Sequence, residues 1–304
     1  MRRWQYRNPM PVARSHCPAA VWNGKIYLFG GGGANFQSLQ SVAIYDPKDD
    51  RWSSGRDMPT LRSGTMAVTL GDRIYVMGGG FKQPDGKFVF FRTVEIYDPR
   101  LDSWSLGPDL LMPHDYPSTV VFEDSIYIFG GHHPDATQAG PLTDPGFSFC
   151  ERLDLKQGRW VGVAPLPTPR FATAALASNG RILVLGGAGY RPEGFTNFAL
   201  SESYDPEAQT WRPEEQFPLP WRAAGVGACV LDGKLLIAGG FDGETVHKRA
   251  AVWDAGNRTW QELDPMPESR MAMATLVSGD TLYLLGGRGD DRKTPLNTVV
   301  AFVR

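Results

Sequence analysis

Cysteine is scarce in this sequence, and the few that occur lie far apart. The chain of 304 residues contains three, Cys17, Cys150 and Cys229, which are too few and too scattered for a disulfide framework. We therefore expect buried, unreactive thiols and a reducing, cytoplasmic setting. No apolar run approaches the roughly 20 residues that span a membrane, and no apolar stretch follows Arg2 and Arg3 as a secretory signal requires.

An excess of either charge is also missing. The 31 basic and 33 acidic residues give a formal net charge of −2, so charge gives no support for a nucleic-acid or anionic-membrane partner. Hydrophobic residues make up 42% of the chain, which is enough for a sizeable core. The 35 glycines and 24 prolines have no collagen period, and this pattern is typical of many short strands joined by tight turns.

A repeat of about 50 residues runs through the whole chain. Diglycines mark it at Gly30-Gly31, Gly78-Gly79, Gly130-Gly131, Gly186-Gly187, Gly239-Gly240 and Gly286-Gly287. Tryptophans follow the first five pairs at Trp52, Trp104, Trp160, Trp211 and Trp260, and Trp4 precedes the first pair. Between them lie Tyr45-Asp46-Pro47, Tyr97-Asp98-Pro99, Leu153-Asp154, Tyr204-Asp205-Pro206 and Trp253-Asp254. Each repeat reads as four short β-strands, which cannot bury both faces alone and need neighbouring copies.

This register of diglycine, Tyr-Asp-Pro and Trp resembles the kelch repeat, and the resemblance covers essentially the whole chain. It implies an all-β fold, a six-bladed kelch β-propeller with four antiparallel strands per blade. The sixth unit stops before a tryptophan strand, whereas the chain begins with an orphan one at Trp4, so we expect the N-terminal strand to close the last blade. The prediction is one domain, residues 1–304, acting as a monomer, with blades near 10–53, 58–105, 112–161, 165–212, 217–261 and 266–304 plus 1–7.

We name the strands of a blade a to d from the axis outward, so that the d–a and b–c loops share one face. In kelch domains that resemble this one, partners bind on that face. Counting back from each diglycine to the start of strand a gives Arg14, Arg62, His114, Arg170, Arg222 and Arg270. A ring of guanidinium groups suits a carboxylate or phosphate, but a charge in a repeat can also tie loop carbonyls together. Both interpretations stay open.

The third blade departs most from the repeat. It has His114-Asp115-Tyr116 at the ring position and the longest b–c loop, His132 through Phe147. All five histidines fall on the same face, and His132 and His133 begin this loop. Long loops in compact domains are usually functional, so we predict a binding site beside blade three, with His114 and Asp115 as candidate catalytic groups. Adjacent histidines usually point apart, so we predict no metal and no cofactor.

Two functions follow as hypotheses. The first is a binding module for a protein segment or a small anionic or organic ligand at the mouth of the central channel, as in kelch adaptors. The second is an isomerase, epimerase or lyase acting on a small organic or carboxylate substrate between the loops of blades 2–4. Aromatic residues flank blade three in both neighbouring loops, at Phe81, Phe88, Phe90 and Phe91 and at Tyr190, Phe195 and Phe198. Arg288-Gly289-Asp290 spells an adhesion tripeptide, which we interpret as chance.

Overall fold

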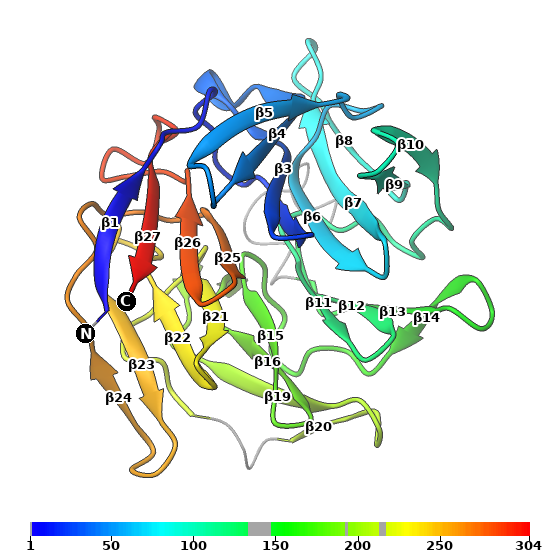
Figure 1. Ribbon diagram of the computed structural model, residues 1–304. Helices are drawn as coiled ribbons and strands as arrows, with labels where there is room; N and C mark the ends of the chain where they lie inside the picture. The colour runs from blue at the N-terminus through cyan, green and yellow to red at the C-terminus, as the bar shows by residue number, and fades with distance from the viewer. Residues whose placement is uncertain (1, 133–146, 192–193, 213–216) are drawn as a thin grey trace.

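The computed structural model describes residues 2–132, 147–191, 194–212 and 217–304. Within these residues the strands form seven antiparallel sheets, of which six are arranged as the blades of a propeller around a central axis and one is a two-stranded hairpin (Figure 1). The predicted fold is confirmed. Among the described residues, no helix has the length and apolar character needed to cross a membrane.

The six blades follow one another along the chain, and each is built in the order a, b, c, d from the axis outward. Blade 1 contains β2 (Ala19–Trp22), β3 (Lys25–Gly32), β4 (Ser38–Asp46) and β5 (Arg51–Gly55), with a 3-10 turn η1 (Ala34–Phe36) in its b–c loop. Blade 2 contains β6 (Ser63–Leu70), β7 (Arg73–Lys82), β9 (Val94–Asp98) and β10 (Ser103–Leu106), and β8 (Phe88–Phe90) pairs with the end of β7. Blade 3 contains β11 (Ser118–Phe122), β12 (Ser125–Phe129), β13 (Cys150–Asp154) and β14 (Arg159–Val163).

The second half of the chain repeats the pattern. Blade 4 contains β15 (Ala174–Ser178), β16 (Arg181–Leu185), β19 (Ser201–Asp205) and β20 (Thr210–Arg212), and its b–c loop forms the hairpin β17 (Ala188–Arg191) and β18 (Gly194–Asn197). Blade 5 contains β21 (Gly227–Leu231), β22 (Lys234–Ala238), β23 (Ala250–Asp254) and β24 (Thr259–Glu262). Blade 6 contains β25 (Ala274–Ser278), β26 (Thr281–Leu285), β27 (Val299–Val303) and β1 (Arg3–Arg7).

Blade 6 is completed by the two ends of the chain, as the strand count predicts. Strand β1 pairs antiparallel with β27, and Trp4 lies opposite Phe302 with ring centroids 4.5 Å apart. The termini therefore lie side by side (Figure 1). This pairing covers an edge of β27 that would otherwise expose unpaired backbone groups.

The core lies between blades rather than within them. Strand β3 shows how alternation produces this: Ile26 and Leu28 pack toward blade 6, whereas Tyr27 and Phe29 pack toward blade 2. The described residues form six such apolar clusters, one at each junction between neighbouring blades. Both faces of each sheet are thus buried against neighbouring blades, whereas a single isolated blade would expose them to water.

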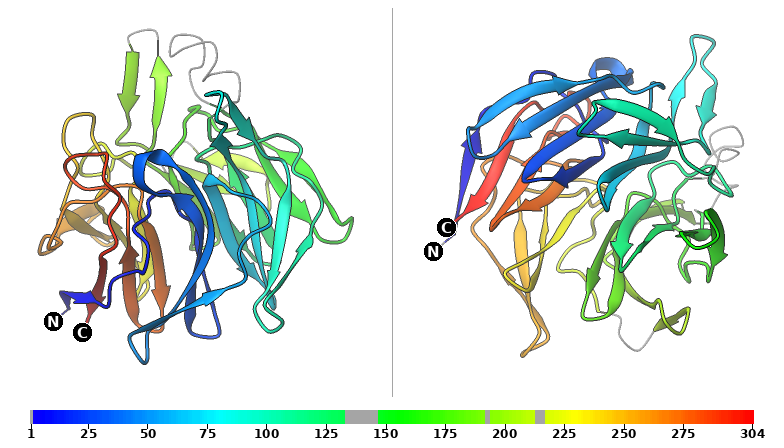
Figure 2. Two further views of the ribbon diagram at one scale, coloured as in Figure 1. Left: turned by 90° about the horizontal axis from the view of Figure 1, so that it is seen from above. Right: turned by 45° about the vertical axis from the view of Figure 1, so that its right-hand side comes forward.

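Turns and tryptophans fix the register of each blade. Asn23 and Gly24 both have positive φ (49° and 76°), as a two-residue hairpin between strands a and b requires. The strand-d tryptophan of each blade donates its Nε1–H to a carbonyl of the preceding segment, at 2.7–3.1 Å in all six blades. The d–a and b–c loops gather on one side of the ring, which we call the mouth face. The hairpin β17–β18 rises from it (Figure 2).

Candidate functional site

Near the start of strand a, every blade has a buried side chain that donates a hydrogen bond. In five blades the donor is the residue that the sequence count predicts, and each of these side chains is at most 1% exposed. Each donates to the carbonyl of the first glycine of its own diglycine, over 2.6–3.1 Å. We call this set the donor ring: Arg14, Arg62, His114, Arg170, Trp221 and Arg270.

Blade 5 is the exception to the predicted set. The backbone bonds place Ala223 at the ring position there, and Trp221, two residues earlier, supplies the donor, since its Nε1–H donates to Gly239 over 3.0 Å. Arg222, the residue counted from the sequence, is exposed on the surface instead. Ala223 lies 16 residues before the first glycine of its diglycine, as the other ring residues do, so the count to Arg222 misses the ring position by one residue.

Buried carboxylates neutralise the donor ring in blades 2, 3 and 4. Each comes from strand c and lies three residues before the aspartate that ends this strand. These carboxylates are Glu95, Glu151 and Glu202. Arg62 Nη2 lies 3.2 Å from Glu95 Oε1, and Arg170 Nη1 contacts Glu202. Burial raises the pKa of Glu95, although the charge of Arg62 opposes this shift. The charges of these ring residues are therefore balanced inside the blade.

The backbone of the ring segment joins neighbouring blades. The second glycine of each diglycine donates its N–H to a ring-segment carbonyl of the next blade, over 2.7–3.0 Å around all six junctions. A Cβ on Gly30 would lie 2.7 Å from the carbonyl oxygen of Arg62, so only glycine permits this approach. These contacts favour the architectural interpretation of the ring arginines. A role for them in ligand binding stays a prediction.

His114, Asp115 and Tyr116 lie together at the axis, but they have different surroundings. His114 is fully buried, with Nδ1 2.6 Å from the Gly130 carbonyl and Nε2 2.9 Å from Glu151. Both ring nitrogens face acceptors, and His114 takes the place that an arginine has in other blades. Asp115 lies against Gly64, and burial raises the pKa of its carboxyl well above the usual value.

A second ring, made of backbone, narrows the channel two residues further along the chain. Its members all have φ between 50° and 63°: His16, Gly64, Tyr116, Ala172, Gly225 and Ala272. Five hydrogen bonds of 2.8–3.0 Å link successive members, from the N–H of one blade to the carbonyl of its neighbour. They enclose a hollow of only about 140 Å³. Recognition on the mouth face must therefore take place above this constriction.

His132 lies in an aromatic cluster at the junction of blades 3 and 4. It is 8% exposed, and its ring meets Phe171 edge-on at 5.0 Å between centroids, with Tyr190 at 6.3 Å. His133 and the rest of the long loop, residues 133–146, lie outside the described residues. In the described part of the chain, no three His, Cys, Asp or Glu side chains gather as a set of metal ligands.

A pocket of about 270 Å³ lies above the constriction, between blades 6, 1 and 2. We call it the mouth pocket. Its lining includes His16 and Tyr116 from the second ring, Phe36 and Phe88 from b–c loops, and Arg288. Arg288 follows the diglycine of blade 6, and its side chain is 1% exposed. Sequence reasoning missed this residue as a site residue, because the equivalent positions are Gly32, Gly80, His132, Ala188 and Phe241 and show no repeated signal.

The mouth pocket does not coincide with the predicted site beside blade three. Of the predicted site residues only Tyr116 lines it, together with Phe88 from the flanking aromatic residues. Ser15 Oγ accepts a 2.9 Å hydrogen bond from Arg288 Nε and lies 2.9 Å from His16 Nδ1. Burial and the charge of Arg288 lower the pKa of His16 to about 3, so the imidazole is neutral near pH 7.

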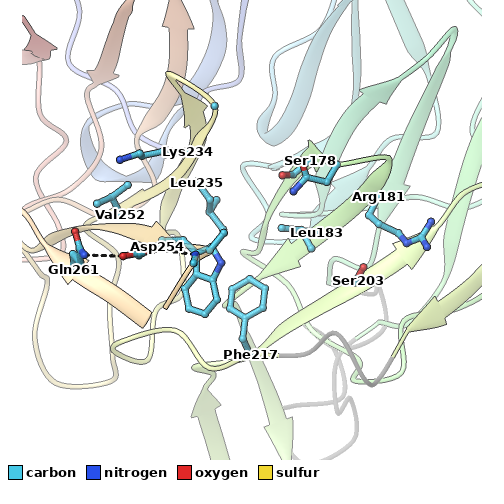
Figure 3. A pocket seen from close by; sticks show the side chains of 15 residues that line it. Ser178, Arg181, Leu183, Ser203, Phe217, Lys234, Leu235, Val252, Asp254 and Gln261 are labelled. Atoms are coloured by element: carbon cyan, nitrogen blue, oxygen red, sulfur yellow. Dashed lines mark hydrogen bonds between the residues drawn. The ribbon is translucent and has the colours of Figure 1, made fainter. Parts of the chain in front are cut away.

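A larger hollow, of about 690 Å³, opens between blades 4 and 5 on the opposite face (Figure 3). Phe217 stacks on Trp253 at its base, with centroids 4.6 Å apart. Its acidic group is already bonded, since Asp254 accepts hydrogen bonds from Gln261 Nε2 at 3.0 Å and from Asn257. The hollow is formed by the turns of strands a–b and c–d and lies away from the channel mouth.

Comparison with known proteins gives matches over most of the chain. The sequence matches the KLHDC2/KLHL20/DRC7 Kelch-repeats domain over residues 1–131 and 64–287. It is 29% identical to Kelch-like protein terF of Aspergillus terreus over 249 residues, 78% of this chain and 52% of that protein. It is 26% identical to Kelch-like protein 36 of Bos taurus over 285 residues, 90% of this chain and 44% of that protein.

These curated relatives are longer than this chain, which spans about half of the length of each of the two. Among solved structures, that of YjhT superposes with a TM-score of 0.81 over 97% of this chain and 96% of the other. The two sequences are 17% identical, so this likeness concerns the fold alone.

Proposed function

The chain belongs to the kelch-repeat family, and from that membership and the shape of its mouth face we propose that it is a binding module. In this proposal it recognises a protein segment or an anionic ligand through the d–a and b–c loops at the channel mouth. Kelch-like relatives over most of the chain support a protein-binding propeller.

The observation that carries the proposal is where the exposed phenylalanines lie. Within the described residues there are three, Phe36 at 60%, Phe88 at 46% and Phe195 at 48% exposed. All three lie in b–c loops, so all three are on the mouth face. Phe88 and Phe195 are carried on hairpins that stand away from the ring (Figure 2). Aromatic side chains are common anchors of protein interfaces, and these three are exposed and therefore accessible to a partner.

Substitutions on the two faces test this proposal. Phe88→Ser and Phe195→Ser are expected to abolish capture of partner proteins by the purified chain, because they remove the anchors. Leu101→Ser and Leu155→Ser are matched controls, since these leucines are 73% and 47% exposed in turns of the opposite face. Quantitative mass spectrometry of captured proteins gives the measurement. Loss of the partners through the leucine variants, with retention through the phenylalanine variants, rejects the proposal.

A second candidate, an isomerase, epimerase or lyase, rests on Asp115. A carboxyl whose pKa is raised by burial holds its proton at higher pH and so has the property of a general acid. The test is deuterium incorporation from D₂O into small carboxylic acids, followed by NMR, with wild type and Asp115→Asn. Incorporation that needs Asp115 supports the enzyme, and none in wild type rejects proton abstraction.

A further inference from the structure

Arg288 holds an unsatisfied donor in the mouth pocket. Its Nε donates to Ser15 Oγ at 2.9 Å, and its Nη1 contacts the carbonyls of Arg292 and Lys293. Its Nη2 is buried and has no hydrogen-bond partner among the described residues. A buried, unpaired donor on a cation costs free energy that an acceptor in the pocket would recover.

The pocket around Nη2 is cationic and aromatic. Arg288 and Lys82 line it, whereas no acidic side chain among the described residues does. The guanidinium carbon of Arg288 lies 3.9 Å from the centroid of the Phe36 ring, and Lys82 Nζ lies 5.9 Å from that of Phe88. The hydroxyls of Ser38 and Ser63 complete the polar part of the lining. The pocket thus combines the buried free nitrogen of Arg288 and the ammonium of Lys82 with two phenyl rings.

We propose that the mouth pocket binds a carboxylate carried on a small planar apolar group, with one carboxylate oxygen on Arg288 Nη2 and the group between Phe36 and Phe88. This deepens the proposed function, on which it rests, by naming the chemistry that the mouth face recognises. The ligand is a free aromatic acid or the same chemistry presented by a bound segment.

Three features favour this ligand over other anions. Ser15 and the loop carbonyls occupy Nε and Nη1, so the guanidinium offers a single contact and not the two-pronged fork that arginine presents to phosphate. The walls are flat rings, which favour a flat group between them. The volume of about 270 Å³ is at the lower limit for ligand pockets, so a group of side-chain size fits and a larger metabolite does not.

Benzoate is the probe, titrated into the isotope-labelled full-length chain and followed by NMR. Benzyl alcohol has the ring without the charge, acetate has the carboxylate without the ring, and inorganic phosphate is a different anion. We expect benzoate to bind in about the millimolar range, since a ligand of this size has few atoms with which to bind. The three controls are expected to bind at least about tenfold more weakly. Equal binding of phosphate, or no benzoate binding, overturns the proposal.

Variants place the site. Arg288→Gln is expected to weaken benzoate binding about tenfold or more, provided that its circular dichroism and thermal unfolding match wild type. Phe88→Ala and Lys82→Gln alter exposed side chains and keep the test valid if Arg288→Gln fails to fold. Each is expected to weaken binding several-fold. Arg258→Gln, at an exposed arginine in the c–d turn of blade 5 on the opposite face, is the control and should change nothing. Unchanged binding in Phe88→Ala and Lys82→Gln overturns the proposal.

The two proposals fail in different ways. If benzoate does not bind while proteins are still captured through Phe88 and Phe195, the carboxylate pocket is wrong and the binding module stands. If benzoate binds and no protein is captured, the pocket stands and serves a free acid. Displacement of a captured protein by benzoate shows that the bound segment itself supplies the carboxylate.

Discussion

Trp4 donates its indole N–H to the carbonyl of Asp264, over 2.7 Å and across 260 positions of sequence. The same bond occurs inside each of the other blades, for example from Trp104 to Arg56 at 3.0 Å. Blade 6 is therefore assembled by the rule that builds the rest, although its outer strand comes from the other end of the chain. This pairing joins the two ends of the chain within one blade.

Removing the Trp4 side chain tests the closure. Trp4→Ala is expected to lower the free energy of unfolding by about 2–4 kcal/mol, because it deletes a large partly buried ring packed on Phe302. Trp4→Phe keeps the ring and loses the hydrogen bond, at a cost of about 1 kcal/mol. Denaturant unfolding measures both. Tyr6→Ala on the same strand, where the side chain is 55% exposed, is the control, and an equal loss there contradicts the prediction.

The donor ring predicts a sharp difference between two arginines. Arg170→Met leaves the carboxylate of Glu202 buried and unpaired, so we expect a loss of about 3–5 kcal/mol in unfolding free energy. Arg222→Met removes an exposed side chain and is expected to change stability by less than about 0.5 kcal/mol. Urea denaturation measures the unfolding free energy of the two variants and so tests this difference. Comparable losses would show that the ring charges are not balanced inside the blades.

Gly64 cannot be replaced by a larger residue for two reasons: its backbone has a positive φ, and Asp115 fills the space that a Cβ would occupy. Its φ is +63°, and an added Cβ would lie 2.3 Å from Asp115 Oδ1. Gly71 has a similar φ of +59° but has open space around it. Gly71→Ala should therefore cost about 1 kcal/mol for the backbone conformation. Gly64→Ala should cost about 2–4 kcal/mol by thermal or chemical unfolding, since it also displaces Asp115. Equal costs would mean that Asp115 moves aside freely.

His16 makes stability depend on pH. Its pKa falls from 6.5 to about 3 on folding, so between these values the unfolded chain binds more protons than the folded one. Its contribution is complete above pH 6.5 and is lost as pH falls toward 3. Asn tolerates the positive φ of this residue, so His16→Asn is a suitable reference.

The difference in unfolding free energy between wild type and His16→Asn should shrink on acidification from pH 7 to 4, by at most about 1.4 kcal/mol per pH unit. Taking the difference removes the effect of Asp115, whose raised pKa acts in the opposite direction. A difference that stays constant over this range contradicts a neutral, buried His16.

The fold was predictable because every blade repeats the same small set of signals. Diglycine and tryptophan each make the same backbone bond six times, so their spacing alone gives the number of blades and the closure. The site was not predictable in this way. A repeated arginine shows that a cation recurs, but its spacing does not show where the guanidinium points.

One further signal was present in the sequence. Glu95, Glu151 and Glu202 recur at one position of strand c, and a repeated carboxylate beside a repeated arginine indicates internal pairing. Arg288 had no such signal. Its position varies from glycine to phenylalanine among blades, and its unpaired nitrogen results from loop contacts that no periodicity encodes.

The bonds that join the blades use the diglycines at the end of strand b, the ring segments and the strand-d tryptophans, and none of them needs the outer part of a b–c loop. Loop length and composition can consequently diverge between blades while the ring keeps its dimensions. The hairpin β17–β18 could be transplanted onto another blade as a cassette, and binding specificity could be re-engineered without redesigning the scaffold.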